Sequence, residues 1–143
     1  MNDIIYLIET YTLANRLSTD KSTQNGAFIV DRNGQIIASG ANHFPKGVEN
    51  LPERWIRPVK YKYVEHAERN AVYDAARNGV KTDGCTMYAA WAACSDCARA
   101  IIQSGIKRVV THHDPLATTR LGQPTSAMWL EEISHALAML KEA

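Results

Sequence analysis

Two short motifs contain residue types that could hold a metal ion and move protons. His66 and Glu68 stand two positions apart at the start of an alanine-rich segment, and Cys94 and Cys97 enclose two polar residues at the start of another. One imidazole and two thiolates are a ligand set of catalytic zinc, which keeps a fourth position open for water. Zinc lowers the pKa of that water towards ~7. Glu68 is spaced to face the water without binding the metal, so we predict that it carries protons.

Each motif alone also has a simpler interpretation. His66 could be an ordinary histidine at a helix start, and Glu68 could act only by favouring the helix N-terminus electrostatically. Cys94 and Cys97 could form a redox pair or a structural half-site. The combination of the two motifs, each expected to open a helix, favours His66, Cys94 and Cys97 as metal ligands. Cys85 is expected to be a buried, small apolar residue.

The elements that position these motifs can be read from the hydrophobic pattern. Apolar residues from Ile4 to Leu17 recur with helical spacing and predict an amphipathic first helix. Asn33-Gly34 lies between two apolar runs and predicts a β-hairpin. The remaining expected elements are a helix from His66 to Asn78, a strand at 86–90, a helix at 97–105, a strand at 107–112 and a helix at 130–140. Such alternation predicts a three-layer α/β domain.

Composition limits the possible classes of protein. The chain has 143 residues, 45% of them hydrophobic and 22% charged, which suits a single globular domain over residues 1–143. The net charge of +1 argues against a protein that binds nucleic acid through its phosphates. No apolar run approaches the ~20 residues that cross a bilayer, and the first residues do not resemble a signal peptide. Three cysteines make a poor disulfide framework, so we expect a cytoplasmic protein.

The two motifs together resemble the signature of zinc-dependent nucleobase deaminases. The wider sequence is similar to deoxycytidylate (dCMP) deaminases over roughly residues 18 to 112. The stretches that carry this likeness are 18–24 with Gly26-Ala27, Gly40 to Gly47, Leu51-Pro52, 60–68 with Asn70-Ala71, 84–88 and 101–107.

The resemblance implies a fold, a reaction and several residue roles. The fold would be the three-layer α/β/α arrangement of cytidine deaminases, with a mixed central sheet of about five strands. The reaction would be the zinc-dependent hydrolysis of dCMP to dUMP and ammonia, with a small nucleotide as substrate and a homo-oligomer as the assembly. Asn42 would contact the sugar or base, the backbone near Ala67 would orient base or water, and Glu68 would shuttle protons.

The chain departs from the family pattern just before Cys94. Ala93 stands where the family usually has proline, and Ala92 stands where it usually has a bulky residue, with Trp91 before them. Trp91 and Ala92 are expected to line the base pocket. The change at Ala92 motivates an alternative, a deaminase of another nucleoside, a free base or a modified base. A nucleic-acid deaminase and a non-catalytic zinc module are further alternatives.

The long loop between the hairpin and the His66 helix is rich in basic residues. It could be a solvated face or could anchor a substrate phosphate through charge-assisted hydrogen bonds. The sequence leaves both interpretations open. The basic residues are Lys46, Arg54, Arg57, Lys60 and Lys62.

Overall fold

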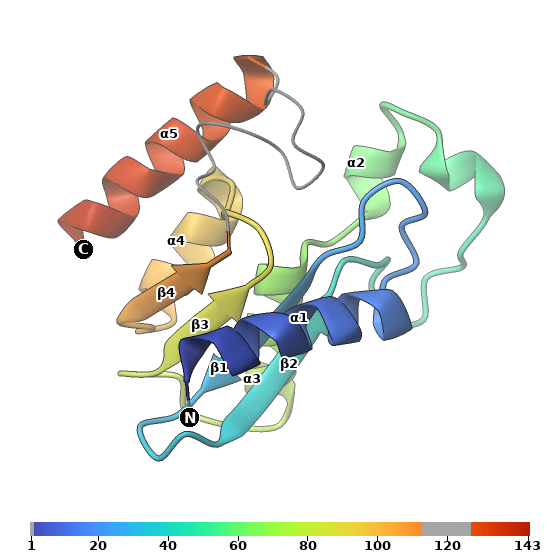
Figure 1. The fold of residues 1–143 in the computed structure, drawn as a ribbon. Helices are drawn as coiled ribbons and strands as arrows, with labels where there is room; N and C mark the ends of the chain where they lie inside the picture. The colour runs from blue at the N-terminus through green and yellow to red at the C-terminus, as the bar shows by residue number, and fades with distance from the viewer. Residues whose placement is uncertain (1, 113–126) are drawn as a thin grey trace.

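A mixed β-sheet forms the centre of the fold in a computed structural model that describes residues 2–112 and 127–143 (Figure 1). Its strands are β1 (Gly26–Val30), β2 (Ile36–Ala41), β3 (Thr86–Ala89) and β4 (Arg108–Thr111), in the order β2-β1-β3-β4. β1 runs antiparallel to β2 and β3, and β4 runs parallel to β3. The expected number of about five strands is wrong for the described residues, which form four, because the chain at 127–142 is a helix and adds no strand beside β4.

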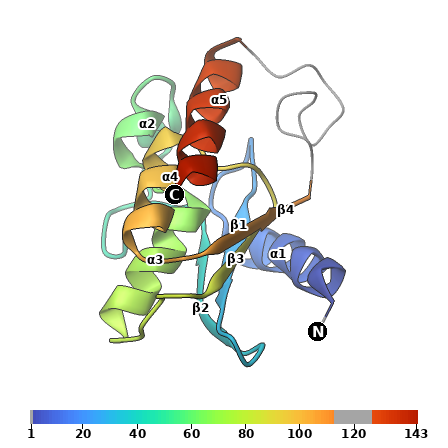
Figure 2. The same cartoon turned by 90° about the vertical axis from the view of Figure 1, so that its left-hand side faces the viewer.

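Helices cover both faces of the sheet and confirm the three-layer α/β/α architecture. Figure 2 shows α1 (Asp3–Leu17) on one face and α3 (Ala67–Arg77) and α4 (Ser95–Gln103) on the other, with α5 (Ala127–Glu142) packed against α4. The short helices η1 (Pro52–Trp55) and α2 (Lys60–Tyr63) lie in the long segment between β2 and α3. None of the helices in the described ranges has both the length and the apolar character needed to cross a membrane.

The side chains of β1 alternate between the two faces of the sheet and contribute to the hydrophobic core on each face. Phe28 and Val30 join the cluster on the α1 side, where Tyr6 and Leu13 are also buried. Ala27 and Ile29 point the other way, into the larger cluster formed with α3 and α4. Successive side chains of a strand face opposite sides of the sheet, so a five-residue strand can be buried throughout.

The predicted first helix is confirmed, but most of its isoleucines lie on the exposed face and not on the buried one. Ile4 and Ile8 are 60% and 57% exposed, whereas Thr10 and Ala14 are buried. The helix lies so close to β1 that a Cβ added at Gly26 would be 2.3 Å from the Thr10 carbonyl oxygen. Only small side chains fit at this contact, and the large buried side chains of Tyr6 and Leu13 pack elsewhere on the same helix.

A second close approach sets the position of α3. A Cβ added at Gly40 of β2 would lie 2.2 Å from the carbonyl oxygen of Ala67 and 2.4 Å from the nitrogen of Ala71. The Asn70 side chain donates a hydrogen bond of 2.7 Å to the Ala41 carbonyl. The start of α3, which carries the first motif, is therefore held directly against the end of β2.

Candidate metal centre and active site

The structure brings the two motifs together at the N-terminal ends of α3 and α4. His66 is the residue that caps α3, and Cys94 holds the same place on α4, with Cys97 in the first turn. One ligand atom from each residue lies within 4.8 Å of the others, and no metal ion is included in the structure. His66 is half-buried and both cysteines are buried. Residues from two separate helices thus form one compact group with sulfur and nitrogen donors.

The spacing within this group fits a tetrahedral zinc ion. The Nδ1 atom of His66 lies 3.4 Å from Cys94 Sγ and 3.6 Å from Cys97 Sγ. Zinc bonds of ~2.3 Å to sulfur and ~2.05 Å to nitrogen, at a tetrahedral angle, place nitrogen and sulfur ~3.6 Å apart. The observed distances match this value, and they identify Nδ1 rather than Nε2 as the nitrogen that would bind the metal.

The surroundings of the two thiols favour a shared negative charge. Hydrogen bonding from Cys97 is the largest influence on Cys94, and together with His66 it lowers the pKa of the Cys94 thiol against the effect of burial. The same hydrogen bond and burial raise the pKa of Cys97. The positive end of the α4 dipole also favours thiolate, the form that binds metals.

Glu68 lies beside the group without belonging to it. Its side chain is buried, and its Oε2 atom lies 3.6 Å from Cys97 Sγ. Burial raises the pKa of this carboxyl group, although the charge of His66 opposes the effect. A raised pKa makes a carboxyl group a better proton acceptor and leaves it able to donate the proton again, as general acid–base catalysis requires. A buried carboxyl group therefore lies next to the metal group, and its role as proton carrier stays a prediction.

Arg69 adds a cation to the site that the two motifs do not reveal. Its guanidinium donates to the Glu65 carboxylate and lies 3.6 Å from Asp96 Oδ2, which links the first turns of α3 and α4. Its Nη1 atom is buried and has no hydrogen-bond partner in the described part of the chain. Arg69 also interacts electrostatically with both thiols. The i,i+4 spacing of Glu65 and Arg69 is the signal that could have identified this pair.

Asn42 is buried and its amide is occupied within the chain. Oδ1 accepts hydrogen bonds of 2.6 Å from Ser18 Oγ and 2.8 Å from the Asn25 nitrogen. Nδ2 donates to the Thr23 carbonyl at 2.5 Å and to Asp20 Oδ2 at 3.4 Å. These four contacts use both donors and both acceptor positions of the amide. In this conformation Asn42 braces the loop between α1 and β1, and its contact with a substrate stays a prediction.

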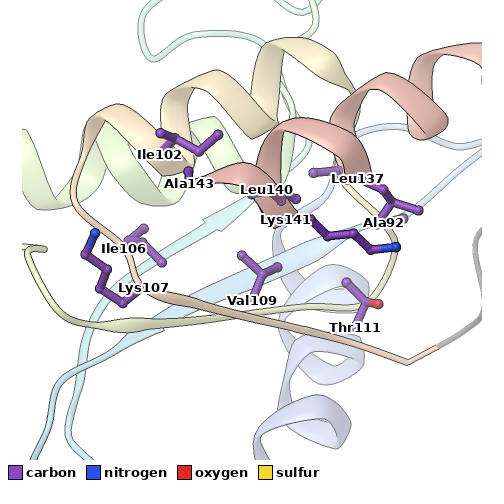
Figure 3. Close-up of a pocket in the computed structure, with 11 residues that line it drawn as sticks. Ala92, Ile102, Ile106, Lys107, Val109, Thr111, Leu137, Leu140, Lys141 and Ala143 are labelled. Carbon is purple, nitrogen blue, oxygen red and sulfur yellow. The ribbon is translucent and has the colours of Figure 1, made fainter.

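The other residues expected to contact the substrate, Ala67, Trp91 and Ala92, differ in burial and in their neighbours. Ala67 is fully buried behind the site, against β2, and Trp91 is half-buried. Ala92 lines a cavity of about 260 Å³ between α4, α5 and β4, with both apolar side chains and the lysines Lys107 and Lys141 in its lining (Figure 3). Ile102, Val109, Leu137 and Leu140 contribute to the same cavity, whose described lining includes neither the metal group nor Glu68. The base-pocket role of Trp91 and Ala92 stays a prediction.

Lys60 does not behave as a free surface cation. Its ammonium group is buried and lies 2.7 Å from Asp20 Oδ2 and 3.0 Å from Ser22 Oγ. The lysine therefore joins α2 to the loop that Asn42 braces. A buried ion pair of this kind is already satisfied and is a poor anchor for a substrate phosphate.

The C-terminal helix also reaches the metal group. The Ser95 hydroxyl donates a 3.1 Å hydrogen bond to the Glu132 carbonyl of α5. Trp129, one turn earlier, is half-buried and packs on the cluster that contains Cys94 and Cys97. Its ring centroid is 6.5 Å from that of His66. No local pattern in the sequence connects position 129 with position 66, so only the fold identifies this neighbour.

Comparison with known proteins agrees with this geometry and confirms the resemblance. Residues 1–113 match the family model of the cytidine and deoxycytidylate deaminase zinc-binding region. The chain is 37% identical to mouse deoxycytidylate deaminase over 124 residues, which are 80% of this chain and 68% of that protein. It is 36% identical to the human deoxycytidylate deaminase over 115 residues, 76% of this chain and 64% of the relative.

A solved structure extends the likeness to the whole fold. The dCMP deaminase of cyanophage S-TIM5, solved with dCMP and dUMP, superposes with a TM-score of 0.72 at 25% identity. The match covers 99% of this chain and 93% of the phage protein. With the family model matching residues 1–113 and the His-Cys-Cys group in place, the chain belongs to the cytidine and deoxycytidylate deaminase family.

Proposed function

We propose that the protein is a zinc-dependent hydrolase that converts dCMP and water to dUMP and ammonia. The observation that carries the proposal is the convergence of three zinc-type ligands with a buried carboxyl group 3.6 Å from one of them. The substrate is inferred from the deoxycytidylate deaminases of mouse and human and from the phage enzyme solved with dCMP and dUMP. The zinc-binding family region identifies the metal.

In this proposal the chain supplies the ligands and the proton transfers. His66 Nδ1 and the sulfur atoms of Cys94 and Cys97 hold zinc, which supplies Lewis acidity and lowers the pKa of water. Glu68 takes a proton from the attacking water and passes it to the ring nitrogen of the base. It then delivers the second proton of the water to the departing amine, so that the base gains an oxygen and ammonia leaves. Burial of Glu68 keeps bulk water from this proton path.

Turnover by zinc-loaded protein tests the proposal directly. We expect ammonia release from dCMP, and we expect Glu68→Gln to retain zinc and the folded state but to lose turnover by more than ~100-fold, because general acid–base catalysis contributes ~10²–10⁴-fold. Glu131→Gln is a matched control, since that side chain is 78% exposed on α5. Unchanged turnover in Glu68→Gln would remove this residue from the mechanism.

A panel of substrates separates dCMP from the alternative bases. Ala92 and Ala93 precede the first cysteine ligand, and both are small and buried, so the space beside the site could suit a different ring. Deoxycytidine, cytosine, guanine and adenosine should react at least ten times more slowly than dCMP. Faster turnover of a free base would replace dCMP as the substrate while keeping the deaminase chemistry.

We also propose the assembly, partner class and compartment. Residues 1–143 form one deaminase domain, because α1, α3 and α4 pack on the same sheet and α5 packs on α4. The exposed side chains of Ile4, Ile5 and Ile8 on α1 support a homo-oligomer, which light scattering can test. The near-neutral charge argues against nucleic acid as a partner. Reduced thiols in the metal group suit the cytoplasm.

A further inference from the structure

We propose that the cavity between α4, α5 and β4 binds a small amphipathic anion, with its carboxylate at Lys141 and its apolar body on the cavity walls. Such a ligand differs from the nucleotide substrate, and its site lies apart from the catalytic one. The described lining of the cavity includes neither the three metal ligands nor Glu68. Binding at this cavity therefore does not depend on the proposed deaminase function.

The cavity is larger than an ordinary packing defect. Its volume is about 260 Å³, whereas voids in close-packed protein interiors rarely exceed one water molecule, ~30 Å³. Its apolar walls come from three elements, with Ile102 on α4, Val109 on β4 and Leu137 on α5 (Figure 3). Each of these side chains is only half-buried. Apolar surface that is still open to water is available to an apolar ligand, because covering it favours binding.

Two lysines give the cavity a positive charge. Lys107 and Lys141 are the only ionisable side chains in its described lining, and both are exposed. Neither forms an ion pair with another residue in the described ranges, unlike Lys60, which pairs with Asp20. An unpaired ammonium group beside an apolar wall complements a ligand that has one anionic end.

The two lysines lie at different ends of the cavity. Figure 3 shows Lys141 extending towards the end where Thr111 and Ala92 lie, and Lys107 at the opposite end. Thr111 stands two residues after Val109 on β4, so its hydroxyl lies on the same face of the strand as the apolar wall. A carboxylate at this end could accept hydrogen bonds from both Lys141 and Thr111. With a single cation at this end, the site suits a monoanion.

The volume of the cavity limits the size of the ligand. About 260 Å³ is the space of roughly nine water molecules, which suits a chain of about eight carbons with its carboxylate. Octanoate is a probe of this size and charge. The binding energy that about ten non-hydrogen atoms supply corresponds to a Kd of ~0.1–1 mM.

Calorimetric titration of the zinc-loaded protein with octanoate tests the proposal. We expect a Kd of ~0.1–1 mM, and we expect 1-octanol, which has the same chain and no charge, to bind at least ~10-fold more weakly. Lys141→Gln should weaken octanoate binding ~10-fold and remove the preference over octanol. The matched control is Lys81→Gln, because Lys81 is exposed and lies outside the described lining. This control should leave the affinity unchanged.

Filling the cavity is an independent test. Leu137→Trp places a larger side chain in the empty space and should weaken octanoate binding more than ~10-fold without lowering the melting temperature. Saturating dUMP should leave the affinity for octanoate unchanged. A carboxylate can also bind zinc, so displacement of octanoate by dUMP would place it at the metal group and overturn the proposal.

The remaining outcomes are equally decisive. Equal affinity for octanoate and octanol, or wild-type affinity in Lys141→Gln, would overturn the anion site. The proposal also fails if the wild-type protein binds no octanoate at ~10 mM, a concentration at least ten times the expected Kd. Each of these results would leave the proposed deaminase function intact, since turnover of dCMP requires the metal group and not this cavity.

Discussion

Replacing Gly40 by alanine should disturb the active site by displacing α3, although Gly40 does not contact any of the proposed metal ligands. The added methyl carbon would lie 2.2 Å from the Ala67 carbonyl oxygen and 2.4 Å from the Ala71 nitrogen, whereas ordinary van der Waals contact begins near ~3.5 Å. Both of these atoms belong to the backbone of α3, so no side-chain rotation can relieve the overlap. The helix must move away from β2 by about 1 Å.

The size of the effect follows from this displacement. Overpacking by one methyl group costs ~1–3 kcal/mol, and a backbone contact that cannot relax belongs at the upper end, about 3 kcal/mol. The moved helix carries Glu68 in its first turn and begins directly after His66. A misplacement of ~1 Å can lower a rate ~10²-fold. We therefore expect Gly40→Ala to lose stability, zinc affinity and turnover together.

Urea unfolding in excess zinc, followed by steady-state turnover, measures these losses. Ser39→Ala is the matched control, because the backbone nitrogen of Ser39 donates to Asp74 and keeps that bond in the variant. The control should change the free energy of unfolding by less than ~0.5 kcal/mol. A Gly40→Ala protein with wild-type stability and full turnover would show that α3 is not held by this contact.

Two further predictions concern a buried ion pair and the metal. Lys60→Met should cost ~3 kcal/mol in urea unfolding, because it leaves the carboxylate of Asp20 buried without its cation. Burial opposes the charge of Asp20, but hydrogen bonds from Lys60 and Ser22 prevail and lower its pKa. The ionised Asp20 therefore contributes its full stabilisation above its pKa in the unfolded chain, ~4, and this stabilisation is lost as the pH falls through its lower pKa in the folded protein. Asp20→Asn should remove this loss from acid-unfolding curves. Removal of zinc by a chelator should lower the melting temperature and make Cys94 and Cys97 reactive towards a thiol reagent, and equal reactivity before and after chelation would contradict their role as ligands.

The local features of the active site could be predicted because they depend on short-range patterns. The spacing of His66 and Glu68, and of Cys94 and Cys97, places each pair in one helical turn wherever the helices lie. The hairpin at Asn33-Gly34 and the start of α3 at His66 follow from turn and capping preferences over a few residues.

The buried face of α1 shows what such patterns leave open. The spacing of Ile4 and Ile8 indicates a helix correctly, but it cannot reveal that Thr10 lies within reach of Gly26 on a neighbouring strand. Burial of a residue depends on what packs against it, and the partner is distant in sequence. At a close contact only small side chains fit, and the spacing of apolar residues does not show where that contact lies.

By itself, then, the sequence determined the family, zinc as the metal and the order of the main helices and strands, and it left the roles of the site residues as predictions. The tertiary structure alone decided that the ends of α3 and α4 meet with His66 Nδ1 3.4 Å from Cys94 Sγ, that the amide of Asn42 is used within the chain, and that Trp129 faces His66. Residue type and short spacing are properties of a few neighbouring positions. Proximity between distant positions arises from the packing of whole helices on the sheet, which depends on every residue at their contact.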